Sequence, residues 1–274
     1  MVPFCSIAQN IKIWFNIIII YNNDRKVHAM ITAGQVFDLL NKEFPFETQE
    51  SWDNSGLLVY SGLETDTVLV CLDVTAEAVE KAVELGAKII VSHHPVIFSG
   101  LTSIYSGDVV YQLIKNDISV ISAHTNFDKY QFGTSYAIAE KLGLDIIPDD
   151  SFEFGIIADT DGISVQELGW KCKSVFGSAA VTLPHNRVNT VFICAGSGSG
   201  MKEEVIESGA DCFLCGESKY HDMLDLAAEG ISTITVGHDS SEKISVETLA
   251  NLIKDNFEDT DVHVFLAENL VHNI

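Results

Sequence analysis

The sequence predicts an α/β protein of two related α/β lobes, whose mostly parallel sheets face each other across a cleft. Apolar, β-prone runs alternate with helical segments, the order of these segments repeats once, and polar residues cluster after equivalent runs. Alternating strands and helices form parallel sheets joined by right-handed crossovers. At 274 residues, the chain can bury the core of one large domain or of two small ones.

The first half begins with an amphipathic segment over 31–44, directly after Met30. Beyond it, short runs of β-prone apolar residues predict strands, and segments with apolar residues at helical spacing predict helices. The predicted order is strand 65–74, helix 75–86, strand 87–94, helix 107–117 and strand 118–124.

The second half continues the alternation. Its last helix has a single apolar stripe, formed by Val246, Leu249, Ile253 and Phe257. The predicted order is strand 188–196, helix 201–209, strand 210–217, helix 221–230, strand 231–238, helix 245–257 and strand 261–269.

Two pairs of segments repeat along the chain. Residues 68–95 match 191–221 in the order strand, loop, helix, Glu-x-Gly-Ala, strand and polar cluster, and residues 108–128 match 221–242. All strand–helix–strand units look alike to some extent. The shared Glu-x-Gly-Ala, and the shared spacing of four residues from a histidine to a carboxylate, favour a true structural repeat.

We expect residues 30–130 with 236–274 to form the first lobe, residues 131–235 the second, and residues 1–29 an N-terminal extension outside the fold. The apolar run 11–21 in the extension is broken by a lysine and an asparagine. It is shorter than the ~20 residues of a spanning helix, and no small-x-small cleavage motif follows it. The composition therefore favours an extension over a membrane anchor.

The overall charge excludes two classes of partner. The formal net charge is −23, whereas a nucleic-acid-binding surface needs clustered Lys and Arg. The same charge disfavours anionic membranes and concentrates divalent cations. The six cysteines lack disulfide spacing, and the Cys212–Cys215 pair lacks the second pair of a tetrahedral zinc site. We therefore expect buried thiols and a cytoplasmic protein.

Three short clusters of histidine and carboxylate indicate metal chemistry. Each cluster follows a predicted strand, and ligands of α/β proteins bind in crevices at such strand ends. Mixed imidazole and carboxylate ligation suits Zn, Fe or Mn, and the side chains are more numerous than one ion usually takes. The sequence therefore predicts two divalent metal ions in the cleft between the lobes. The predicted metal-binding residues are His93, His94, His124, Asp128, His238 and Glu242.

The spacing within each cluster indicates how its side chains point. Because side chains alternate along a strand, His93 and His94 are expected to splay toward two different ions. In the other two clusters a histidine and a carboxylate are four residues apart, so a helical turn would bring them onto one face. For the last cluster we expect a helix capped by Ser240 or Ser241, with Glu242 in its first turn.

Three neighbouring segments are candidates for substrate contact. Glu217 and His221 lie where the adjacent histidines lie in the first half, and they are predicted as acid/base residues. The segment Trp52–Ser55 fits the mouth of a cleft as well as a plain turn. The Gly/Ser loop 196–200 has backbone N–H groups suited to a phosphate, but it matches no nucleotide-binding motif, and a tight turn is favoured.

One known family shares six motifs with this chain. They are WDNSGLLV (52–59), LDVT (72–75), SHHPVIF (92–98), AHTNFD (123–128), GESKYHD (216–222) and GHDSSE (237–242). With them the chain closely resembles the Nif-three-like dinuclear-metal family, whose members are often named GTP cyclohydrolase I type 2 homologs. The resemblance covers about residues 30–274, and it is to the short members, which have no extra domain between the halves. At 237–242 the family commonly has GHYATE, so the histidine and glutamate are kept and only the loop differs.

The resemblance implies a two-lobed α/β subunit, a homohexameric toroid and a dinuclear metal centre in the cleft. It implies five ligands, with a sixth residue as a further ligand or a close neighbour of the ligands. The five are His93, His94, Asp128, His238 and Glu242, and the sixth is His124.

Two functions remain open at this point. The first is a metal-dependent hydrolase in which two metals activate a water for attack on an electrophile. The resemblance suggests the purine ring of GTP as its substrate, and a phosphoester suits two metals equally well. The second is a metal-binding or regulatory protein without catalysis. The ligand set alone does not separate the two.

Overall fold

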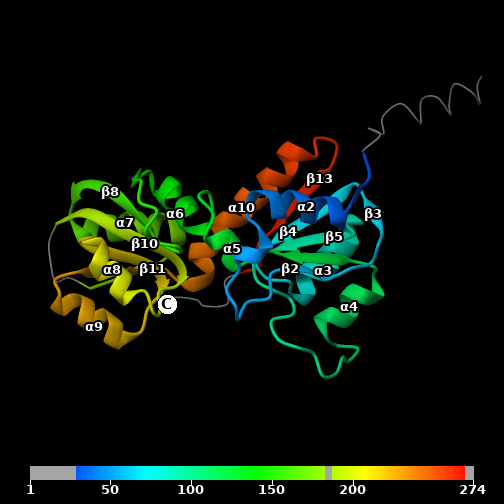
Figure 1. Cartoon of the computed structure of the whole chain (residues 1–274), viewed down its shortest axis with the longest axis horizontal. Helices are drawn as coiled ribbons and strands as arrows, with labels where there is room; N and C mark the ends of the chain where they lie inside the picture. The colour runs from blue at the N-terminus through cyan, green and yellow to red at the C-terminus, as the bar shows by residue number, and fades with distance from the viewer. Residues whose placement is uncertain (1–28, 183–186, 269–274) are drawn as a thin grey trace, which may run out of the picture.

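The computed structural model describes residues 29–182 and 187–268, which form two mixed sheets with helices packed on and between them (Figure 1). The predicted extension 1–29 lies almost entirely outside the described residues. Among the described helices, none is long and apolar enough to cross a membrane.

The first sheet has five strands in the order β13-β4-β5-β6-β2. Its first four strands are parallel, and β2 is antiparallel to β6. A separate antiparallel pair joins β1 (Ile31–Thr32) to β3 (Glu64–Thr65). The strands of the main sheet are β2 (Gly56–Val59), β4 (Thr67–Cys71), β5 (Ile89–Ser92), β6 (Ser119–Ser122) and β13 (Asp261–Phe265).

The second sheet has six strands in the order β7-β8-β10-β11-β12-β9. Only the central strands β10, β11 and β12 are parallel, and the flanking strands pair antiparallel. The predicted parallel character therefore holds at the centre of both sheets, and the second sheet is mixed. Its strands are β7 (Asp145–Ile147), β8 (Ile156–Ile163), β9 (Ala180–Val181), β10 (Val188–Ser197), β11 (Cys212–Glu217) and β12 (Ser232–Thr235).

The helices connect the strands in the repeating order that the sequence predicts. The unit β4-α3-β5-α4-β6-α5 in the first half corresponds to β10-α8-β11-α9-β12-α10 in the second. The lobe boundaries at 130 and 236 stay a prediction, and we propose them on this repeat. The helices are α2 (Ala33–Glu43), a 3-10 turn η1 (Phe46–Thr48), α3 (Ala76–Leu85), α4 (Val109–Lys115), α5 (Thr125–Asp128), α6 (Thr134–Leu142), α7 (Val165–Phe176), α8 (Lys202–Ser208), α9 (Tyr220–Ala228) and α10 (His238–Asn256).

Helix α10 begins seven residues earlier than the predicted helix 245–257, directly at His238. The expected serine cap was wrong, because Gly237 is the N-cap residue and no side chain caps the helix. Gly237 has a φ of 100°, a value that favours glycine, and this turn lets the strand pass into the helix without a loop.

Helix α10 joins the hydrophobic cores of the two sheets (Figure 1). Near its start, Ile244 packs against the core of the second sheet. Further along, Val246, Leu249 and Ile253 are fully buried in the core of the first sheet. The predicted apolar stripe is therefore confirmed as buried over these three positions, while Phe257 lies at the end of the helix and is partly buried.

Replacing Leu249 with alanine is expected to lower the free energy of unfolding by about 2–5 kcal/mol, because it leaves a cavity in a core that cannot fully collapse. The exposed Leu224 on α9 provides a matched control, and Leu224→Ala is expected to change stability by less than about 0.5 kcal/mol. Chemical denaturation measures both. Equal losses would contradict the role of α10.

Candidate metal centre

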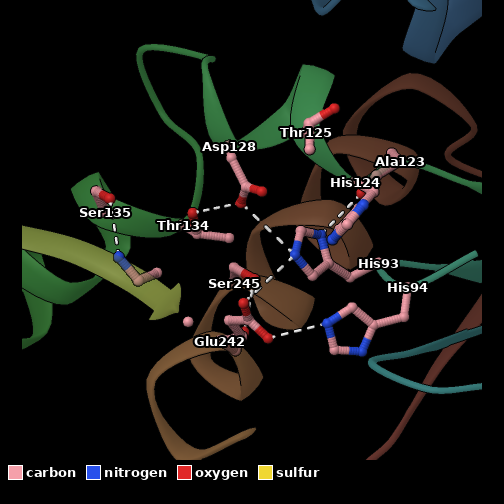
Figure 2. A network of polar contacts seen from close by, with 12 residues as sticks. His93, His94, Ala123, His124, Thr125, Asp128, Thr134, Ser135, Glu242 and Ser245 are labelled. Carbon is pink, nitrogen blue, oxygen red and sulfur yellow. Dashed lines mark hydrogen bonds and ion pairs between the residues drawn. The ribbon is translucent and has the colours of Figure 1, made fainter. Parts of the chain in front are cut away.

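The three predicted clusters meet at the carboxyl ends of β5 and β6 and at the start of α10 (Figure 2). Two imidazoles directly follow β5, an imidazole and a carboxylate lie at the two ends of α5, and one of each lies in the first turns of α10. In this order they are His93, His94, His124, Asp128, His238 and Glu242.

Strand register brings the first-sheet residues together. The last residues of β4, β5 and β6 are register partners across the sheet. Asp73, His94 and His124 each lie two positions beyond those partners, so they meet at the carboxyl end of the parallel strands. Because β4, β5 and β6 are parallel, their carboxyl ends are neighbours.

The second sheet contributes space for the centre. In the repeat, β10 of the second sheet corresponds to β4 of the first, and Gly196 of the one corresponds to Asp73 of the other. Gly196 has a φ of 61°. A Cβ at Gly196 would overlap the carboxylate of Glu242. A Cβ at Gly216 would come within 2.6 Å of Ser241 Oγ. Both glycines therefore permit the close approach of α10 to the strand ends.

Each histidine of the centre has an oxygen beside its Nδ1 atom. A histidine that donates a proton from Nδ1 keeps the lone pair on Nε2, which is the form that binds metal. This arrangement directs the Nε2 atoms toward the centre. The pairs are His93 with the Ala123 carbonyl (2.8 Å), His94 with Asp73 (2.7 Å), His124 with Asp53 (2.8 Å) and His238 with Glu217 (3.1 Å).

The carboxylate of Glu242 lies between three of these imidazoles, and Figure 2 shows its contacts with two of them, His93 and His94. Its Oε2 atom is 3.1 Å from His94 Nε2 and 3.3 Å from His238 Nε2, and its Oε1 atom is 4.0 Å from His93 Nε2. The carboxylate of Asp128 lies 3.5 Å from the same His93 Nε2 atom. Thr134 Oγ1 donates a hydrogen bond of 2.7 Å to this carboxylate.

Two buried atoms of the centre have no hydrogen-bond partner among the described residues, namely His93 Nε2 and Glu242 Oε2. The ion-pair approaches to Glu242 Oε2 are short but lack hydrogen-bond geometry. A buried polar atom without a partner is costly, and a cation supplies the missing partner. Two groups of three side chains each have their ligand atoms within 4.8 Å of one another. They are His93 with His94 and His124, and His94 with His238 and Glu242. This His/Glu group could bind metal.

The ionisation of the centre reflects this crowding. Burial favours the neutral form of His94, but its hydrogen bond to Asp73 and its ion-pair contact with Glu242 raise the pKa of His94 to about 10. Contact with Glu242 raises the pKa of His238 to about 9, against the effect of burial. Burial opposes the charge of Glu242 as well, yet the imidazoles hold its pKa well below the usual range. Burial lowers the pKa of His93 and raises that of Asp128.

A cleft of about 410 Å³ opens beside the centre. Its lining combines four residues of the centre with apolar side chains and with serine and threonine residues. Its lining is Trp52, His124, Thr125, Asp128, Thr134, Ser135, Phe154, Cys194, Ala195, Ser197, Ser199, Met201, His238 and Glu242.

The Gly/Ser segment 196–200 ends β10 and leads into α8, with a backbone hydrogen bond from Met201 N to the Gly198 carbonyl across the turn. Gly196 N donates to Ser241 Oγ at 2.9 Å, and Gly198 N donates to the Glu217 carbonyl at 2.8 Å. These backbone N–H groups are therefore already used within the fold.

The predicted acid/base residues lie at the edge of the site. His221 is exposed on α9, pairs with Asp222 at 3.4 Å and does not line the cleft. Glu217 contacts His238 Nδ1, so its position suits orienting that ring. Their catalytic role stays a prediction.

Sequence reasoning did not assign the functions of Asp53 and Asp73. In the sequence, Asp53 lies in a polar segment of open role, and Asp73 lies in the motif LDVT. Strand register is the signal for Asp73, because this residue lies 21 positions before His94 in the sequence but beside it across the sheet. Burial alone would raise the pKa of Asp53, but hydrogen bonds from His124 and Thr125 hold it well below the usual range.

Comparison with known proteins identifies the family. The model of the DUF34/NIF3 family (NGG1p interacting factor 3) matches residues 31–270. The chain belongs to this family. The resemblance inferred from the motifs is therefore confirmed.

Curated relatives in this family cover most of the chain. The "GTP cyclohydrolase 1 type 2 homolog" of Campylobacter jejuni is 33% identical over 229 residues, which are 81% of this chain and 91% of the relative. The "GTP cyclohydrolase 1 type 2" of Helicobacter pylori strain J99 is 34% identical over 228 residues, 78% of this chain and 88% of the relative.

Solved structures show the same fold. A Staphylococcus aureus hypothetical protein, SA1388, superposes with a TM-score of 0.80 at 28% identity, over 90% of this chain and 100% of that chain. A Bacillus cereus protein related to NIF3 superposes with a TM-score of 0.81 at 18% identity, over 89% of this chain and 99% of that chain. At that identity the second likeness shows the fold alone.

Metal binding at neutral pH is expected to release protons. At pH 7, below the pKa values of about 10 and 9, His94 and His238 are protonated, and a metal ion must displace those protons. Apparent affinity should therefore fall as pH falls. Calorimetric titration with Zn²⁺ in buffers of different ionisation enthalpy measures the released protons, and a heat that does not depend on the buffer would contradict this charge state.

Replacing Asp73 with asparagine is expected to weaken metal binding by about 10–100-fold, because the His94 ring loses its charged acceptor at Nδ1. The exposed Asp255 near the end of α10 is a matched control, and Asp255→Asn should bind as the unaltered protein does. Competition with a chelator measures the affinities. An unchanged affinity in Asp73→Asn would show that the contact does not orient the ligand.

Proposed function

We propose that the chain is a metal-dependent hydrolase with two divalent ions, Zn, Fe or Mn, held by the six residues of the centre. The observation that supports this is the pair of buried atoms without partners, His93 Nε2 and Glu242 Oε2, inside two overlapping groups of ligand atoms. Glu242 would help to hold both ions, because its two oxygens face different imidazoles.

Two such ions would supply Lewis acidity and a water of lowered pKa next to the cleft. The chain's own residues would orient these ligands. Asp73, Asp53 and Glu217 hold three of the rings through Nδ1, and Thr134 holds Asp128. The hydroxyl groups of Ser197 and Ser199 in the cleft lining are suited to hydrogen bonds with polar groups of a substrate, whereas those of Thr125, Thr134 and Ser135 already donate within the protein.

The substrate class that we propose is a GTP ring or a phosphoester. The name of the Helicobacter pylori relative supports the first, and the general fit of two metals to phosphoester hydrolysis supports the second. We further propose a cytoplasmic homo-oligomer, a hexamer, on the family resemblance, and no nucleic-acid or membrane partner, on the net charge of −23.

A metal-binding or regulatory protein without catalysis is the second candidate, and one observation favours it. In the described part of the chain, every histidine and carboxylate that lines the cleft is itself a proposed ligand. No separate histidine or carboxylate there is placed to move a proton to a leaving group.

The double variant Asp128→Asn with Glu242→Gln is expected to lose its metal and any turnover, because it removes both carboxylates of the centre. The metal content of purified protein and hydrolysis of GTP and a phosphoester panel, with each metal restored, measure this. The exposed pair Asp145→Asn with Glu64→Gln is the matched control.

The outcomes separate the proposals. Unchanged metal content in the double variant would refute the site. Full metal occupancy of the unaltered protein without turnover of any substrate would refute the hydrolase and favour the non-catalytic alternative.

A further inference from the structure

The segment Trp52–Ser55, whose role the sequence leaves open, is firmly attached to the metal centre. The side chain of Asp53 is fully buried and accepts hydrogen bonds from His124 Nδ1 at 2.8 Å and from Thr125 Oγ1 at 2.6 Å. Ser55 Oγ also donates to Asp53, at 2.9 Å. The position of Trp52 is therefore tied to a ring of the centre through its neighbour in sequence.

The indole ring of Trp52 lies at the mouth of the cleft with much of its surface open. It is 56% exposed, although it lines the cleft. Its centroid is 6.1 Å from the His124 ring, at an interplanar angle of 77°. It is also 6.1 Å from the ring of Phe98, which is 52% exposed and lies 6.3 Å from His124.

A hydrogen bond joins the two segments that present these rings. Asn54 Nδ2 donates to the carbonyl oxygen of Ile97, the residue before Phe98. Trp52 and Phe98 are thus placed side by side by polar contacts, without being buried themselves. Open aromatic faces held in this way beside a cleft are suited to binding another aromatic ring.

We propose that Trp52 and Phe98 form a stacking surface that binds the planar aromatic ring of the substrate next to the metal centre. The inference rests on the proposed function, since it names which part of a substrate the cleft selects. A ring without charge also suits a chain of net charge −23, because that field does not oppose its binding. The lining of the cleft also includes Phe154 and Met201 as further apolar side chains.

Calorimetric binding to the zinc-restored protein tests this surface with two probes. Guanosine has the ring without a phosphate, and ribose 5-phosphate has the phosphate without the ring. Trp52→Ala is expected to weaken guanosine binding by roughly tenfold or more, as loss of stacking on a base does, and to leave ribose 5-phosphate binding unchanged. Trp52→Phe should retain most of the guanosine affinity.

Trp170 provides the matched control. It is 67% exposed on α7 and is absent from the lining of the cleft, so Trp170→Ala should bind guanosine as the unaltered protein does. Metal content is measured in every variant and is expected to stay constant, because Trp52 offers no metal ligand.

Three results would overturn the stacking surface. They are no binding of guanosine by the unaltered protein at millimolar concentration, equal affinity in Trp52→Ala, or an equal loss of ribose 5-phosphate binding. Because binding is measured without turnover, a protein that binds guanosine through Trp52 but hydrolyses nothing would refute the hydrolase alone.

Discussion

The contact between each histidine's Nδ1 atom and an oxygen is the interaction on which the centre depends. It decides which nitrogen faces the carboxylates, and so whether the imidazoles can act together as ligands. In the first sheet the oxygens come from the Ala123 carbonyl, Asp73 and Asp53, and in the second half from Glu217. Three of these partners are carboxylates, which also strengthen the basicity of the rings they hold.

The centre also requires a close approach between the two sheets. Glu242 is almost fully buried, and it reaches the imidazoles of the first sheet from a helix that begins just after β12 of the second sheet. The approach is possible because Gly196 and Gly216 have no side chains where α10 passes. The same helix then buries Leu249 in the core of the first sheet, so the position of Glu242 and the packing between the sheets have one structural cause.

Part of this arrangement could be predicted from the sequence. The four-residue spacing of His124 with Asp128, and of His238 with Glu242, correctly indicated helical turns after strands. The start of α10 was missed because Gly237, and not a serine, makes the junction. Strands β7, β8 and β9 were not predicted, since they pair antiparallel outside the repeat. The contact of Asp73 with His94 depends on strand register, which one sequence does not reveal directly.

Anomalous diffraction from crystals grown with Zn²⁺ or Mn²⁺, recorded at the absorption edge of the metal, tests the central claim most directly. We expect two metal peaks per chain, coordinated by the Nε2 atoms of the histidines, with Glu242 between them and the Nδ1 atoms still bound to their oxygens. A single peak, peaks bound through Nδ1, or peaks away from Glu242 would contradict it.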